Sequence, residues 1–124
     1  MNPQRVIARR RAERAAHIAT AERFVRQLDS ALGVRAVVVF GSVARGDFNH
    51  WSDIDVLVIA ERLPERPLDR FAVLPEPPDD VQPVVWTPPE WHQELARSNP
   101  IAVEAASDGV WLVGSPAALD PVTP

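Results

Sequence analysis

The order of apolar and polar positions divides the chain into alternating helical and extended segments. Apolar side chains recur at steps of three and four along residues 18–32, and we expect a long amphipathic helix over residues 3–31. Residues 34–40 and 52–59 are rich in β-branched apolar residues, which is typical of buried strands. The remaining pattern predicts further strands and short helices, over residues 42–45, 67–74, 81–86, 87–97, 99–107 and 110–113.

Strands that alternate with helices favour an α/β or α+β fold over a helical bundle. The 124 residues of the chain suit one domain, to which we assign residues 1–114. Three prolines fall after Gly114, so residues 115–124 are expected to form a flexible tail.

Composition and charge narrow the classes of protein. The net charge of −4 gives no global positive field, so we do not expect a nucleic acid as the direct substrate. Basic residues gather at Arg9, Arg10, Arg11 and Arg14. This run is compatible with a solvated helix face and also with a contact to a partner. The absence of cysteine excludes disulfides and thiolate metal sites. No secretory or membrane-spanning pattern is present, so a cytoplasmic location without a membrane partner is expected.

The stretch that indicates chemistry combines a glycine turn with a pair of carboxylates. Gly41-Ser42 follows a predicted strand, and ten residues separate Ser42 from Asp53 in the pattern GS-x10-D-x-D. Strand positions two apart share a face, about 6.5 Å from one another, so Asp53 and Asp55 present two carboxylates together. These carboxylates repel each other unless a cation or proton lies between them, and Mg²⁺ suits such oxygen ligands. Glycine lets the backbone approach a phosphate closely, and the Ser42 hydroxyl can donate to a phosphate oxygen.

The sequence GSVARG at residues 41–46, followed by SDIDVLV at residues 52–58, resembles the nucleotidyltransferase superfamily of DNA polymerase β and kanamycin nucleotidyltransferase. It looks most like the minimal nucleotidyltransferases of toxin–antitoxin pairs. The resemblance implies a mixed central β-sheet flanked by helices. It also implies Mg²⁺-dependent transfer of a nucleotidyl group, AMP from ATP, to a protein hydroxyl. The chain would then be the antitoxin of a small helical HEPN toxin; whether copies of the chain associate with each other is left open.

The resemblance also implies roles for individual residues. Asp53 and Asp55 would be catalytic and hold the metal. The residues implied to bind the nucleotide are Gly41, Ser42, Arg45 and Ser52. For two of these the residues alone leave alternatives open, because Arg45 fits an ion pair with Asp47 as well as a phosphate contact, and Ser52 fits a turn.

The next strand departs from the pattern of active relatives, which carry a third carboxylate there as a general base. That position reads Gln82 here, and an amide cannot accept a proton at neutral pH. Three interpretations stay open: slow activity with two carboxylates, replacement by Asp80 or Asp79, or a degenerate module that binds a nucleotide or partner without turnover. A small-molecule transferase of the aminoglycoside type is a further alternative, although no second domain for such a substrate is evident.

Overall fold

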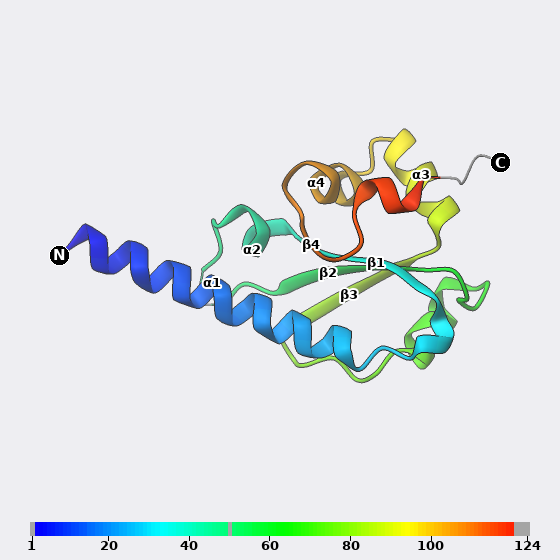
Figure 1. Cartoon of the computed structure of the whole chain (residues 1–124), viewed down its shortest axis with the longest axis horizontal. Coiled ribbons are helices and arrows are strands. Elements are labelled where there is room, and N and C mark those ends of the chain that lie inside the picture. The colour runs from blue at the N-terminus through cyan, green and yellow to red at the C-terminus, as the bar shows by residue number, and fades with distance from the viewer. Residues whose placement is uncertain (1, 50, 121–124) are drawn as a thin grey trace.

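Four strands form one mixed sheet in the order β3-β2-β1-β4 (Figure 1). The structure, a computed structural model, describes residues 2–49 and 51–120. β1 runs antiparallel to both β2 and β4, whereas β2 and β3 are parallel. The bounds of the strands are Val34–Phe40 for β1, Ile54–Ala60 for β2, Val81–Trp86 for β3 and Val110–Val113 for β4.

Helices cover both faces of this sheet (Figure 1). α1 packs on one face, and α3 with α4 packs on the other. The predicted mixed sheet with flanking helices is therefore confirmed. The helices are α1 (Pro3–Arg26), α2 (Gly41–Arg45), α3 (Pro88–Ala96) and α4 (Pro100–Asp108), with 3₁₀ turns η1 (Ser30–Leu32), η2 (Pro67–Val73) and η3 (Pro116–Leu119).

The alternation of side chains along β2 assigns each residue to one face. Val56 and Val58 belong to the cluster on the α1 side, together with Phe24. Leu57 and Ile59 belong to the cluster on the α3 and α4 side. Because side chains alternate with a period of two, Asp55 lies on the face of Leu57 and Ile59. The carboxylate that the sequence singles out therefore sits on the sheet face that α3 and α4 cover.

A partly buried ion pair joins the connection between β2 and β3 to the start of α3. Arg70 of η2 is only 4% exposed, and its Nη1 donates to Glu90 Oε1 at 2.6 Å and to the Val85 carbonyl. Glu90 also closes the predicted capping box with Thr87. The connection is thereby tied to the edge strand β3, although it holds five prolines between residues 61 and 80.

Three boundaries differ from the sequence-based expectation. β2 begins at Ile54 rather than at residue 52, so Asp53 lies just before the strand. α1 ends at Arg26, because Asp29 caps the separate turn η1 and Gly33 ends that turn with a left-handed φ of 64°. Residues 115–120 are not loose: η3 forms there, and Leu119 is 3% exposed within the cluster on the α3 and α4 side. Residues 121–124, the rest of the expected tail, lie outside the described residues. Within the described part of the chain, no helix combines the length and apolarity that crossing a membrane requires.

Candidate functional site

The glycine turn and the second aspartate lie against each other where β1 ends and β2 begins. The last residue of β1, Phe40, pairs with Asp55 in the antiparallel ladder, and Gly41 follows directly with a φ of +74°. A Cβ built on Gly41 would lie 2.5 Å from Asp55 Oδ2, closer than two such atoms can approach. Gly41 is therefore required both by the left-handed backbone and by contact with the carboxylate.

Asp53 and Asp55 form an unequal pair. Asp53 is exposed and immediately precedes β2, whereas Asp55 is half-buried. Burial raises the pKa of Asp55 above its ordinary value, and the charges of Asp53 and Glu104 raise it further, while Arg45 acts in the opposite direction. The two aspartates are thus close enough to repel each other electrostatically. The structure brings Gly41 into contact with Asp55, whereas Asp53 lies just before the strand on which both aspartates were expected.

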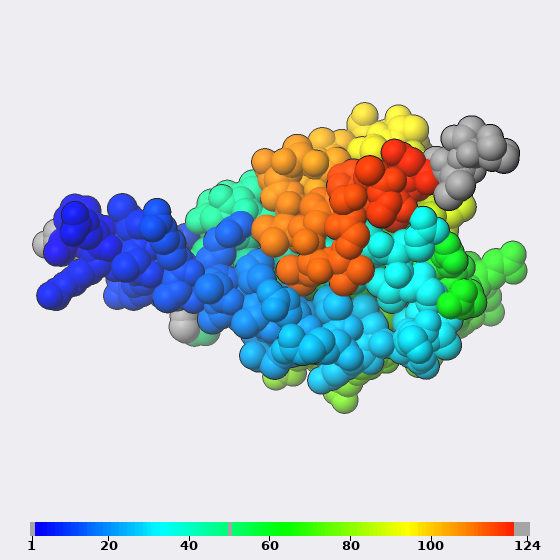
Figure 2. Space-filling view, in the orientation of Figure 1, coloured from blue at the N-terminus to red at the C-terminus, as the bar shows by residue number. Residues whose placement is uncertain are grey.

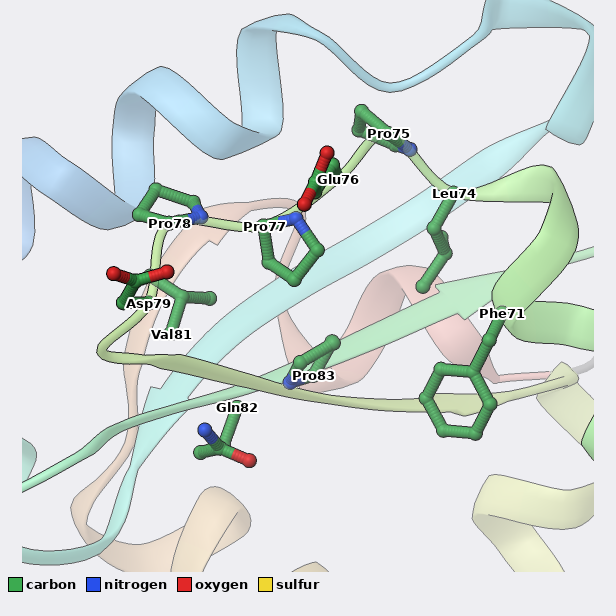
Figure 3. Close-up of a pocket in the computed structure, with 10 residues that line it drawn as sticks. All are labelled: Phe71, Leu74, Pro75, Glu76, Pro77, Pro78, Asp79, Val81, Gln82 and Pro83. Atoms are coloured by element: carbon green, nitrogen blue, oxygen red, sulfur yellow. The ribbon is translucent and has the colours of Figure 1, made fainter.

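Gln82 occupies the place beside Asp55 on the neighbouring strand. In the parallel ladder of β2 and β3, Asp55 is the register partner of Gln82, and register partners share a face of the sheet. Figure 3 shows Gln82 pointing away from Pro83 and from Pro77, on the other side of β3. The predicted position of the third strand is confirmed, and its residue beside the carboxylate pair is an amide.

Asp80, the alternative third carboxylate, comes before β3 in a turn. It is exposed, and its backbone carbonyl accepts from the Ile54 N–H at 2.7 Å. This hydrogen bond lies just before the first register pair of the parallel ladder, Ile54 and Val81. It fixes the backbone of Asp80 next to the first residue of β2.

Arg45 and Ser52 both have protein partners. Arg45 Nε donates to Asp47 at 3.1 Å, and its Nη1 donates to Glu104 at 2.9 Å. These hydrogen bonds leave the N–H groups of Nη2 for a further acceptor. Ser52 Oγ accepts from the Asn49 N–H at 2.9 Å, so it closes the turn before β2.

Glu104 is a residue of this site that sequence reasoning missed. It lies on α4 and reaches the site only because α4 packs against α2, where it pairs with Arg45. It is 59 residues from Arg45 along the chain, and no local pattern marks it. Its charge also contributes to the raised pKa of Asp55.

The donor set at the site fits a cation that is shared with a substrate. Asp53 and Asp55 offer carboxylate oxygens, the ligands that Mg²⁺ prefers, and Mg²⁺ is normally held by one or two carboxylates together with substrate phosphates. Among residues 2–49 and 51–120, no group of three or more His, Cys, Asp or Glu side chains is arranged to hold a metal alone. Asp53 and Asp55 would hold the metal, and phosphate oxygens would complete its ligands.

Known proteins resemble this chain in sequence and in fold. A protein of Methanocaldococcus jannaschii named "Putative protein adenylyltransferase" is 51% identical over 39 residues, which is 32% of this chain and 26% of that protein. The match thus spans about a quarter of the relative's length. A crystal structure from Sulfolobus solfataricus, described as a "putative nucleotidyltransferase", is 23% identical with a TM-score of 0.59, covering 82% of this chain and 84% of that one. A structure described as "the toxin-antitoxin with AMP-PNP" is 18% identical with a TM-score of 0.48, covering 82% and 76%.

The Sulfolobus structure shows the shared fold, and the family follows from the sequence. A family model described as the nucleotidyltransferase domain matches residues 18–107, which include the glycine turn, both aspartates and Gln82. The prediction that the chain is a transferase is confirmed at the level of this family. The chain belongs to the nucleotidyltransferase domain family, as its GS-x10-D-x-D pattern predicts.

Proposed function

We propose that the chain is a Mg²⁺-dependent adenylyltransferase that moves AMP from ATP to a hydroxyl of another protein. The observation that carries the proposal is the packing of Gly41 against Asp55, with Asp53 two residues earlier in the chain. A relative named as a protein adenylyltransferase, 51% identical over 39 residues, supports both the adenylyl group and the protein acceptor.

In the proposed reaction, the acceptor oxygen bonds to the α-phosphorus of ATP, the bond to pyrophosphate breaks, and the acceptor gives up its proton. Gly41 has no side chain, so the backbone can approach the phosphates closely, and the Ser42 hydroxyl and the Nη2 of Arg45 are donors for phosphate oxygens. Mg²⁺ held by Asp53 and Asp55 would neutralise phosphate charge and align the reacting groups. The raised pKa of Asp55 means that a proton competes with this cation more strongly than at an ordinary aspartate.

The acceptor that we propose is a small helical toxin encoded next to this chain. The support is the likeness of GSVARG and SDIDVLV to the minimal nucleotidyltransferases of toxin–antitoxin pairs. If the assignment is correct, the chain carries label from radioactive ATP onto the product of the adjacent gene. Labelling of this chain alone, or of no protein, would count against an antitoxin role.

Metal dependence tests the nucleotide site directly. ATP should bind more tightly with Mg²⁺ than with EDTA, because the cation removes the repulsion between the carboxylates and the phosphates. The variant with both Asp53→Asn and Asp55→Asn should lose the difference. Because Asp55 has a raised pKa, the Mg²⁺-dependent part of the affinity should fall on acidification at a higher pH than an ordinary aspartate would give. Calorimetry that finds equal ATP affinity with Mg²⁺ and with EDTA contradicts the proposal.

The register of Gln82 with Asp55 favours a second candidate function. An amide at this position leaves the site without the carboxylate that could accept the acceptor's proton, so the chain would bind a nucleotide or a partner without turnover. Under this alternative ATP binds normally, and the transfer step is absent.

Two substitutions separate these functions. If the base is missing, Gln82→Asp should raise transfer by about 10²–10⁴-fold, the usual contribution of a positioned acid–base group. If Asp80 serves as the base, the wild type is already active and Asp80→Asn silences it. Equal transfer by the wild type and both variants would show that neither residue takes the proton.

A further inference from the structure

The beginning of α1 lies outside the family domain but contacts the candidate site. α1 starts at Pro3, whereas the match to the family begins at residue 18. Residues 3–17 are therefore an extension of about four helical turns, and Figure 2 shows its first turns projecting from the body of the molecule. Two arginines of this extension nevertheless reach α2 and the loop that follows it.

Arg14 holds the last turn of α2 by two hydrogen bonds. Its Nε donates to the Val43 carbonyl at 3.0 Å, and its Nη2 donates to the Ala44 carbonyl at 2.9 Å. Carbonyls in the last turn of a helix have no partner within that helix, and the negative end of the helix dipole attracts a cation. α2 has only five residues, which is too short to be stable on its own. Its position therefore depends on contacts such as these.

Arg10 holds the loop after α2, one helical turn earlier along α1. Its Nη2 donates to the Gly46 carbonyl at 3.0 Å and to the Phe48 carbonyl at 2.6 Å. Its guanidinium also lies over the ring of Phe48, 4.5 Å from the centroid, and His17 meets the same ring edge-on at 5.2 Å. The extension thus fixes the segment that leads from the glycine turn towards Asp53.

The neighbouring arginines of the same run make no such contacts. Arg9 and Arg11 are exposed, and neither forms a hydrogen bond or ion pair with the described residues. The arginine run is therefore divided between a solvated face and a face that contacts α2. Arg9 serves as the matched control for Arg10 and Arg14, because it lies on the same helix and carries the same charge. Arg11 is unsuitable as a control, since it lines a groove together with Gly46 and Phe48.

We propose that Arg10 and Arg14 are positioning residues of the nucleotide site. They hold α2 and the following loop so that Gly41 and Ser42, at the other end of α2, stay aligned with Asp55. On the far side, Arg45 of α2 pairs with Glu104 of α4, so α2 is held between α1 and α4. This inference rests on the proposed function for its effect on ATP, and it adds the N-terminal extension to the site.

The test compares Arg14→Met and Arg10→Met with Arg9→Met in the intact chain. Calorimetry with ATP and Mg²⁺ should show a loss of affinity on the order of tenfold for Arg14→Met, about 1.4 kcal/mol, because two charge-assisted hydrogen bonds are lost. Arg14→Lys should recover part of this affinity, since an ammonium keeps the charge but not the two-donor fork. The Arg9→Met control should bind as the wild type does. Hydrogen exchange of residues 41–48 should accelerate in Arg14→Met and not in Arg9→Met.

Each outcome separates this inference from the proposed function. If Arg14→Met melts earlier but binds ATP as tightly as the wild type, the arginines only stabilise the fold and the inference is wrong. If Arg14→Met does not fold, Arg14→Lys carries the comparison. If the wild type binds no ATP, the proposed function fails. Hydrogen exchange then decides the remaining structural claim, and equal exchange of residues 41–48 in the wild type and the variant overturns it.

Discussion

Replacing Gly41 with alanine tests the contact on which the site assignment depends. The new methyl group would have to occupy a place 2.5 Å from Asp55 Oδ2, on a backbone with a φ of +74°. A left-handed backbone costs a residue with a Cβ about 1–2 kcal/mol. The clash adds to this cost, because the Asp55 carboxylate must rotate away or the turn must open.

Gly46 provides a control for the backbone part of this cost. It also has a left-handed φ, of +88°, but a Cβ built there meets nothing within 4 Å. Gly46→Ala should therefore lose about 1–2 kcal/mol of unfolding free energy from the backbone alone. Gly41→Ala should lose more, and the difference between the variants measures the contact with Asp55.

Urea unfolding and calorimetry with ATP and Mg²⁺ give the two quantities. We expect Gly41→Ala to lose most of its Mg²⁺-dependent ATP affinity, because the displaced carboxylate no longer faces the metal position, and Gly46→Ala to lose much less. If the two variants are equal in both stability and affinity, the close approach of Gly41 to Asp55 has no role in the site.

Two further predictions concern the fold around the site. Glu90→Gln should lower the unfolding free energy by about 1–3 kcal/mol near neutral pH, because it leaves the buried charge of Arg70 without its carboxylate. Burial acts to raise the pKa of Glu90, but hydrogen bonds from Thr87 and Arg70 outweigh it and lower the pKa. The stabilisation is therefore complete above the unfolded pKa and is lost as the pH falls through the folded one. Denaturation at several pH values should show the gap between wild type and Glu90→Gln closing in acid; a constant gap argues against the ion pair. Leu119→Ala should cost about 2–5 kcal/mol in thermal or urea unfolding, because Leu119 is 3% exposed, whereas an unchanged stability would mean that η3 is not part of the core.

The sheet could be predicted because its strands have a strong local signal. Residues 34–40 and 54–60 form β1 and β2 and are apolar, β-branched runs next to the glycine turn and the carboxylates. The capping box at Thr87 and Glu90 was also readable, since both residues lie within one turn. The folding of η3 could not be predicted, because a stretch with prolines and a single leucine resembles a loose tail. Only the packing of α3 and β1 provides the surface that Leu119 contacts.

The site was predictable only where its residues are close in sequence. Gly41, Asp53 and Asp55 come from one β-turn-β unit, whose spacing fixes their geometry. Glu104 and Arg14 lie far along the chain and reach α2 from opposite sides, so only the packing of α4 and α1 reveals them. The arginine run gave no signal that would separate Arg14, which bonds to α2, from Arg11, which is exposed.

The neutral side chain of Gln82 has to be judged together with the charges around Asp55. Asp55 is half-buried, and the charges of Asp53 and Glu104 repel it while that of Arg45 attracts it. A carboxylate at position 82, beside Asp55 in the ladder, would add a further like charge and raise the pKa of Asp55 again. Gln82→Asp therefore has two effects. It supplies a carboxylate that can act as the base, and it adds a negative charge that a bound cation has to neutralise. Its transfer activity is a fair test of the missing base only at saturating Mg²⁺ and at a pH where Asp55 is ionised. Under those conditions an inactive Gln82→Asp variant would mean that the wild type lacks more than one carboxylate.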